Sequence, residues 1–428
     1  MTPDESVGAT TIRKVTRRLI PFLILCYFAA YLDRVNLSFA AATMNRDLGF
    51  SPAVYGWGAG VFFLGYALFE APANYALHRV GARIWIARIM LSWGLVSALT
   101  AFVRDAGSFY AVRFLLGVAE AGFMPGVILY LTWWTPAALR GRILAAFLFA
   151  VPAATVAGAP LSELLLTFAD GALGLRGWQW LFIVEALPAI ALGLATLFIL
   201  TDRPAHATWL TAEERAWLVC EVGAPPPSGA EGDWGGVRAA LVDPRVPALG
   251  LAYFGVVFAL YGLSMWLPQI IGGYRLGTGA ATAATAAPFA VGALAMLVWG
   301  RLADRSGRHV RFVAIAAGVA ALGLFAAAGT STLAGALVAI CIAAAGVFSV
   351  LPTFWAMVSP LFGGVGAAIA IALINSIGNL AGFLGPWAVG WIRETTGGYP
   401  AALLALGCGA LVSAAITLRA GRAHVPVR

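Results

Sequence analysis

Long apolar segments recur along this chain, and their length is the strongest constraint on its fold. A helix needs about 20 consecutive, mostly apolar residues to cross the hydrocarbon core of a bilayer. Backbone in lipid must also satisfy its hydrogen bonds internally, so such segments predict helices. The sequence therefore predicts an all-α membrane protein with twelve transmembrane helices, at 17–43, 53–77, 84–103, 108–134, 142–167, 178–200, 246–271, 281–303, 311–329, 332–358, 364–392 and 400–419.

The composition excludes several other classes of protein. Hydrophobic residues make up 61% of the chain and charged residues only 11%, which is unlike a soluble domain. The four histidines lie in expected connections or in the tail, and the sequence has no phosphate-binding loop, nucleophile elbow or metal-ligand spacing. We therefore expect no enzyme activity, no ATP-driven transport, no metal and no cofactor.

The distribution of basic residues predicts the topology. If the N-terminus is cytoplasmic, then 20 of the 27 Lys and Arg residues fall in cytoplasmic segments. The positive-inside rule then predicts that both termini are cytoplasmic. The net charge of +8 is thus explained by topology, and no nucleic-acid partner is expected.

A polar stretch divides the twelve segments into two sets of six. We expect an N-terminal six-helix bundle at 1–200, a cytoplasmic linker at 201–245 and a C-terminal six-helix bundle at 246–428. Within the linker, Thr211 is a candidate N-cap with Glu214 three residues later. This pattern predicts a short amphipathic helix on the membrane surface.

The two sets carry a faint internal repeat. "HRVGARIW" (His78 to Trp85) follows the second segment, and "DRSGRHVR" (Asp304 to Arg311) follows the eighth, at the corresponding position. A duplicated six-span unit is typical of secondary transporters, which bind substrate near the midplane between their halves.

The sequence resembles the major facilitator superfamily. "GRLADRSGR" (Gly300 to Arg308) matches the cytoplasmic loop motif of that superfamily, whereas the first copy departs from it, with His78 in place of an acid. Within the superfamily the chain is similar to the anion:cation symporter family. Five stretches from both sets carry this second resemblance: "YLDRVNLSFAA", "FEAPANYALHRVGARIWIARI", "RFLLGVAEAGFMPGVILYLTWW", "YGLSMWLPQI" and "LINSIGNLAGFLGP".

Charged residues inside the expected spans need an explanation, because each costs about 2.5 to 3.5 kcal/mol at the centre of a span. Asp33 and Arg34 are adjacent in the first span, and Arg113 and Glu120 are seven residues apart in the fourth. That spacing returns Arg113 and Glu120 to one helix face, about 10 Å apart along the axis. Each is therefore free to meet a partner on another helix, and Asp33 and Arg34 are the nearest candidates in kind.

Two interpretations of this charge quartet remain open. The four residues are either structural ion pairs that fix helix register, or functional groups. In the functional interpretation, Arg34 or Arg113 receives a substrate carboxylate, for which the planar guanidinium is suited. Buried acids such as Asp33 and Glu120 can then exchange protons near neutral pH. The family resemblance implies proton coupling at Asp33 and Glu120 and anion binding at Arg34 and Arg113.

Other polar residues in the spans are assigned as follows. We expect Glu70 and Glu185 to be structural, and Glu163 to be hydrated near the outer end of its span. The resemblance implies that three more residues line the substrate pocket: Tyr66, Trp355 and Asn375. Asn379 lies one turn from Asn375 on the same face, and we expect it in the pocket too, because an amide at mid-span normally has a hydrogen-bonding purpose.

The sequence thus predicts a proton-coupled symporter that imports a small organic carboxylate by alternating access. The alternatives are an exporter or drug:proton antiporter of the same fold, and a membrane sensor that does not transport. The expected partners are an organic anion, protons and lipid, and the expected state is a monomer in the cell inner membrane. A sugar acid, a hydroxy-dicarboxylate and an aromatic acid remain open as the substrate, as do the coupling ion and stoichiometry.

Overall fold

The protein is described by a computed structural model that covers residues 3–222, 242–362 and 364–422. Within these ranges the chain is almost wholly helical and has no β-strand. Twelve stretches of helix are long and apolar enough to cross a membrane, which confirms the expected number of spans. These are α1 (Pro3–Leu48), α2 (Pro52–Val80), α3 (Ala82–Leu99), α4 (Ala106–Glu120) continued by α5 (Phe123–Trp134), α6 (Ala137–Phe168), α7 (Gly177–Ile199), α10 (Arg245–Gly272), α11 (Thr278–Ser306), α12 (His309–Ala328), α13 (Leu333–Val358), α14 (Gly364–Thr396) and α15 (Pro400–Arg422).

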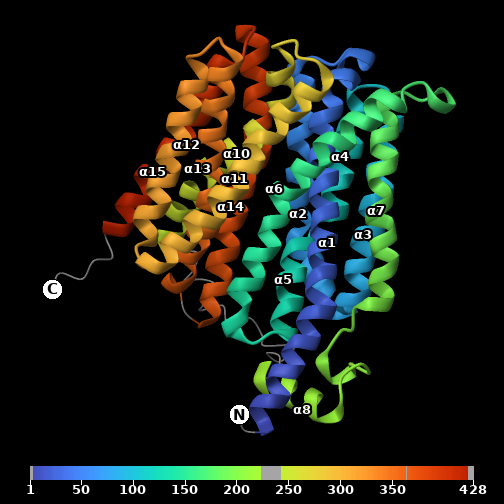
Figure 1. The fold of residues 1–428 in the computed structure, drawn as a ribbon, viewed down its shortest axis with the longest axis vertical. Helices are drawn as coiled ribbons and strands as arrows, with labels where there is room; N and C mark the ends of the chain where they lie inside the picture. The colour runs from blue at the N-terminus through green and yellow to red at the C-terminus, as the bar shows by residue number, and fades with distance from the viewer. Residues whose placement is uncertain (1–2, 223–241, 363, 423–428) are drawn as a thin grey trace.

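The helices form two groups side by side (Figure 1). We call α1–α7 the N-half and α10–α15 the C-half. The most extensive packing between the halves is that of α2 with α14, α6 with α11, and α1 with α10. Part of the expected linker, residues 223–241, lies outside the described residues, so the domain boundaries at 200 and 246 stay a prediction.

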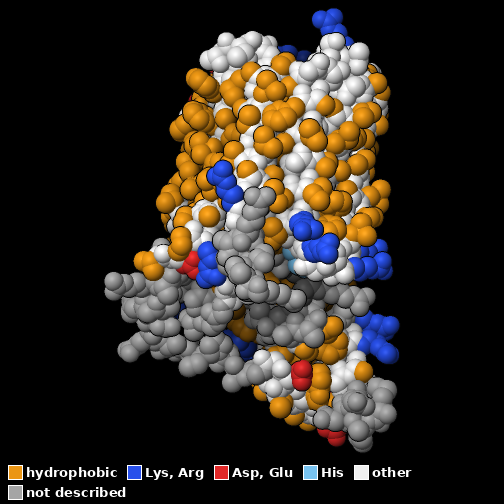
Figure 2. Space-filling view, turned by 90° about the vertical axis from the view of Figure 1, so that its left-hand side faces the viewer, with side chains coloured by type: hydrophobic (Ala, Val, Ile, Leu, Met, Phe, Trp, Pro, Cys, Tyr) orange, Lys and Arg blue, Asp and Glu red, His pale blue; other side chains and the backbone are white. Residues whose placement is uncertain are grey.

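Two ends of the bundle can be named by their connections. The termini end carries the connections at Gly81 and Gly307, and the far end carries those at Gly49 and Gly397. On the face shown in Figure 2, hydrophobic side chains cover the middle of the bundle between its two ends, and Lys and Arg gather toward the termini end. This distribution is that of a membrane-embedded surface with a basic rim.

The repeat seen in the sequence has a structural counterpart. Gly81 separates α2 from α3 with φ +95°, and Gly307 separates α11 from α12 with φ +64°. Residues with a Cβ rarely adopt such angles, so a glycine at both positions lets the chain reverse in a short connection. The two halves therefore share this turn as well as their number of spans.

The first helix extends beyond the membrane. Its 46 residues correspond to about 69 Å, against about 30 Å of hydrocarbon. The extension contacts α8 (Ala212–Val222), where Lys14 forms an ion pair with Glu214 at 2.7 Å. The expected capping box is present, because the Thr211 hydroxyl accepts from the Glu214 amide at 3.2 Å and the Glu214 carboxylate accepts from the Thr211 amide at 2.9 Å.

Candidate functional site

A buried ion pair joins α1 to α4 at the boundary between the halves. Arg34 donates from Nη2 to the carboxylate of Glu120, and the two side chains are only 11% and 5% exposed. The same guanidinium donates from Nη1 to the hydroxyl of Tyr261 on α10, at 3.2 Å. The Tyr261 hydroxyl lies 3.3 Å from that of Tyr31. Arg34 is thus held by an acid of the N-half and a phenol of the C-half.

Aromatic rings surround the Arg34 guanidinium. Its Cζ lies 5.2 Å from the ring centroids of Tyr31 and Phe62 and 5.8 Å from that of Tyr66. Cations are attracted to the faces of such rings, which partly replaces the water lost on burial. Tyr66, expected from the sequence to line the pocket, is buried and lies beside this cation.

Arg113 is the second buried cation. It is 1% exposed, and its Nε donates to the backbone oxygen of Gly58 at 3.3 Å. Its Nη2 is buried and has no hydrogen-bond partner. Its Cζ lies 5.1 Å from the Phe62 ring centroid, and the Arg34 Cζ lies 5.2 Å from the same centroid. The two Cζ atoms are therefore no more than about 10 Å apart. Among the described residues, no carboxylate lies within 4.0 Å of Arg113.

Asp33 points to a different set of neighbours. It is 2% exposed and accepts hydrogen bonds from the Ser97 hydroxyl of α3 and from the Asn36 amide, the latter at 3.0 Å. The quartet expected from the sequence is thus divided. Arg34 and Glu120 meet directly, whereas Asp33 and Arg113 are near enough to interact electrostatically but are not hydrogen-bonded.

A break in the fourth span positions Glu120. The sequence predicts one continuous helix at 108–134, but α4 ends at Glu120 and α5 begins at Phe123. Gly122 between them has φ +81°. Such breaks are tolerated at membrane depth where the backbone is buried in protein, and they commonly form ion sites in transporters. The carbonyl end of α4, which favours cations, therefore lies beside the Arg34 guanidinium.

The C-half residues expected in the pocket are less closely engaged. Trp355 is half-buried, with its ring 5.1 Å from Tyr253 and 5.4 Å from Phe354. Asn375 and Asn379 are half-buried on one face of α14. In the described part of the chain, no hydrogen bond engages either amide, so both are free to meet a ligand.

The halves are packed together at the far end. The Tyr55 hydroxyl of α2 donates to the Met265 backbone oxygen at 2.8 Å, across the boundary. Glu394 at the end of α14 accepts from the Ser51 hydroxyl at 2.8 Å and from the Ala53 amide at 2.7 Å, and so caps the start of α2. The structure is therefore closed between the charged site and the far end.

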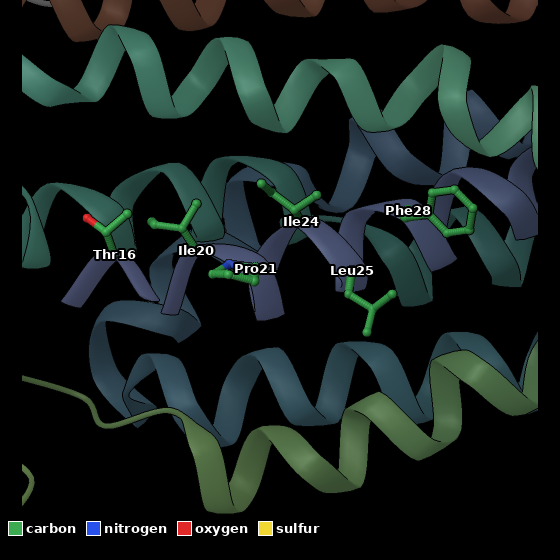
Figure 3. A pocket seen from close by; sticks show the side chains of 6 residues that line it. All are labelled: Thr16, Ile20, Pro21, Ile24, Leu25 and Phe28. Carbon is green, nitrogen blue, oxygen red and sulfur yellow. The ribbon is translucent and has the colours of Figure 1, made fainter. Parts of the chain in front are cut away.

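Two hollows lie away from the charged site. One of about 460 Å³ lies at the far end and is lined in part by Arg46, Gln269 and Arg393. The other, of about 400 Å³, is a groove along α1 (Figure 3). Its lining is apolar except for one threonine, and it has no group that would bind an anion. It consists of Thr16, Ile20, Pro21, Ile24, Leu25 and Phe28.

Sequence reasoning missed several residues of the site. Tyr31 precedes Arg34 by three residues and so shares its helix face, a spacing visible in the sequence. Phe62, Ser97 and Tyr261 come from other helices, and only the packing of the helices brings them to Arg34 and Asp33. The three acids expected to have minor roles differ in burial: Glu70 and Glu163 are half-buried, whereas Glu185 is 1% exposed.

Two groups of membrane-spanning helices, with a buried ion pair of the N-half at their boundary, have the architecture of a membrane transporter. The family model of the Major Facilitator Superfamily matches residues 23–386 of the sequence, and the chain belongs to this superfamily.

Similar proteins agree with that membership, and the first of them also agrees with the resemblance to organic-acid permeases. A putative tartrate transporter from Agrobacterium vitis is 49% identical over 97% of this chain and 92% of its own length. A quinolone resistance transporter from Acinetobacter baumannii is 39% identical over 92% of this chain and 90% of its own. A bacterial homologue of the lysosomal transporter Spinster, solved in an inward-facing and unoccupied conformation, has the same fold, with a TM-score of 0.74, 18% identity, and coverage of 96% and 97%.

Proposed function

We propose that this protein is a proton-coupled symporter that imports a small organic carboxylate across the inner membrane by alternating access. Hydroxy-dicarboxylates of the tartrate type are the substrate class that the site and the similar proteins favour together. The termini end is the cytoplasmic end in this proposal, supported by the basic residues gathered there (Figure 2). The protein acts as a monomer.

The ion pair between Arg34 and Glu120 is the observation that carries the proposal. Both side chains are largely buried, so water contributes little to either charge, and removal of one leaves the other to find a new partner. A proton bound by Glu120 releases Arg34, whose guanidinium then receives a carboxylate. When Glu120 loses the proton, it competes for Arg34 and expels the anion. Proton and anion therefore enter and leave the site together.

Arg113 supports a substrate with two carboxylates. Its Nη2 is a buried donor without a partner, a state that an anionic ligand would relieve. The two guanidinium groups share the Phe62 ring and are close enough for a short dicarboxylate to bind both. The relative from Agrobacterium vitis is named for tartrate, which has this charge pattern and two hydroxyls. Tyr261, Asn375 and Asn379 are suited to bind those hydroxyls.

The contact between Arg34 and Tyr261 supports coupling of binding to movement of the halves. A carboxylate bound to Arg34 would replace Glu120 beside the phenol, so both halves would hold the same ligand. The contacts of Tyr55 and Glu394 close the far end, and their release would open the site to the side of the membrane at that end. This is the movement that alternating access requires.

Uptake into liposomes tests the proposal. Purified protein should accumulate labelled tartrate when the outside is more acidic than the inside, and Glu120→Gln should lose this accumulation while it keeps exchange between tartrate on the two sides. Glu163→Gln, which changes a half-buried acid outside the site, is the matched control. Normal accumulation by Glu120→Gln would exclude Glu120 as the coupling residue.

An exporter or drug:proton antiporter is the second candidate, favoured by the similarity to a quinolone resistance transporter. Thermal stability of the purified protein in the presence of organic acids and of amphiphilic drugs distinguishes the two. A ligand at 100 times its dissociation constant adds about 2.7 kcal/mol to the stability of the state it binds. Stabilisation by tartrate that Arg113→Ala abolishes supports import of an anion, and stabilisation by drugs alone supports the antiporter.

A further inference from the structure

Glu185 of α7 is a buried acid that the proposed mechanism has not used. Its side chain is 1% exposed, and one oxygen accepts a hydrogen bond from the Ser162 hydroxyl of α6 at 3.1 Å. The other oxygen, Oε2, is buried without a hydrogen-bond partner. No Lys or Arg in the described ranges comes within 4.0 Å of it. An ionised carboxylate in this position would be desolvated and almost unsupported.

The groups that face Glu185 come from α1 and α6. Asp33 and Asn36 of α1 both lie within interaction range of its carboxyl. The helices α1, α3 and α6 and the short turn Thr100–Phe102 pack against α7. Among the charged side chains that the structure describes on these elements, Arg88 of α3 stacks on Trp85 instead, and Asp33 is the one that interacts with Glu185.

The pattern of unpaired atoms indicates where a proton belongs. Asn36 donates one of its two amide hydrogens to Asp33, and its carbonyl oxygen Oδ1 is buried and unpaired. Glu185 Oε2 is the second buried acceptor without a donor, on a neighbouring side chain. The Asn36 side chain lies within interaction range of the Glu185 carboxyl, and a proton on Glu185 turns its oxygen into a donor for which the Asn36 oxygen is an available acceptor. One proton therefore satisfies both atoms.

Asp33 does not need that proton to the same extent. It already accepts from Ser97 and Asn36, and the charge of Arg113 acts on it as well. Glu185 accepts one hydrogen bond, from the Ser162 hydroxyl, and the Asn36 side chain gives it some further support, but no cation lies beside it and the neighbouring Asp33 repels a second negative charge. Of the two acids, Glu185 is thus the better place for a proton when Asp33 is ionised.

We propose that Glu185 is a further proton-binding site, which forms with Asp33 and Asn36 a cluster that carries one transported proton apart from the anion site. The inference rests on the proposed proton coupling and adds to it a named group on α7. The reaction is the binding of one proton by a carboxylate on one side of the membrane and its release on the other, with no further reactant. Because Asp33 and Arg34 are adjacent on α1, the two sites share one helix.

The proton-to-substrate ratio tests this proposal. Protein in liposomes is held at a series of membrane potentials and pH gradients, and the condition at which net tartrate flux is zero gives the ratio. Glu185→Gln should lower the ratio by one proton per substrate and keep tartrate exchange within about twofold of the unmodified protein. Glu163→Gln, which alters an acid 22 residues earlier on α6, should leave both unchanged. An unchanged ratio in Glu185→Gln overturns the proposal.

Infrared absorption of protonated carboxyl groups gives an independent readout. The unmodified protein near pH 7 should show a buried protonated carboxyl that Glu185→Gln lacks and Glu163→Gln retains. If tartrate transport by the unmodified protein moves no protons, the proposed proton coupling is wrong. The infrared signal then decides separately whether Glu185 binds a proton. If Glu185→Gln does not fold, Glu185→Asp retains an ionisable group, and Ser162→Ala removes the hydroxyl donor and should strengthen the signal of the protonated form. A Glu185 that stays ionised throughout overturns the proposal.

Discussion

The contacts of Glu394 predict how the far end opens. Its carboxylate accepts from the Ser51 hydroxyl and the Ala53 amide at the start of α2, and so joins the last turn of α14 to the first turn of α2. These contacts exist only while the halves are closed at the far end. Glu394→Ala removes both and should therefore shift the protein toward conformations that are open at that end.

The size of the shift follows from the exposure of the site. Hydrogen bonds to charged groups contribute about 1.5 to 3 kcal/mol when sheltered, but exposed charged pairs contribute only about 0.2 to 1 kcal/mol. Glu394 is exposed, and the favourable position of its carboxylate beside the N-terminus of α2 adds about 0.3 to 1 kcal/mol. We therefore expect a loss of about 1 kcal/mol, which corresponds to about a fivefold change in the ratio of open to closed molecules.

Distances between spin labels measure this ratio. Labels at Arg46 and Arg275, which are exposed at the far end of the two halves, report its opening in a background without native cysteines. Thr395→Ala is the matched control, because the Thr395 hydroxyl donates to backbone oxygens of its own helix and to no other group in the described residues. The same distance distribution in Glu394→Ala and Thr395→Ala would refute the reasoning, since it would mean that the carboxylate does not hold the halves together.

Two further predictions concern the helix break and the contact of α8. Gly122→Ala should destabilise the protein by about 1 to 3 kcal/mol more than Gly171→Ala. The two glycines have nearly the same φ, +81° and +82°, but the new Cβ meets a neighbour, Ala73 at 2.6 Å, at Gly122 and none within 4 Å at Gly171. Equal losses of stability on thermal unfolding would contradict this. Burial alone would raise the pKa of Glu214, but hydrogen bonds from Lys14 and a backbone amide hold that pKa below its usual value. This stabilisation is present at neutral pH and is lost as the pH falls through the lowered pKa, so Lys14→Ala should move the loss of α8 docking to higher pH in hydrogen exchange of the α8 amides. An unchanged midpoint would exclude the ion pair as its cause.

The number and order of the spans could be predicted because hydropathy and length act locally. Each segment carries its own apolar run, and a backbone in lipid has few alternatives to a helix. The break between α4 and α5 escaped this reasoning, because hydropathy runs on without interruption from Ala106 to Trp134. Gly122 and Pro125 were visible in the sequence, but both residues also occur inside unbroken transmembrane helices. Gly122 lies close against Ala73 of α2, a contact between distant parts of the chain that local patterns do not reveal.

The charged site could be predicted in kind but not in pairing. The free-energy cost of a charged side chain inside a span is enough to identify the residues that need partners, namely Asp33, Arg34, Arg113 and Glu120. Which partner each one finds depends on helix rotation and on side chains from distant parts of the chain. Tyr261 reaches Arg34 from α10, and Ser97 reaches Asp33 from α3. Local patterns do not encode such contacts between separate helices.

The adjacency of Asp33 and Arg34 has a geometric consequence for coupling. Successive residues on a helix point about 100° apart, so these two cannot serve one site from the same face. Arg34 faces Glu120 and the C-half, whereas Asp33 faces Ser97 and the interior of the N-half. A small rotation of α1 about its axis would therefore alter both environments at once. A proton gained on one face and an anion bound on the other are linked in this way through the stiffness of a single helix, without a direct contact between them.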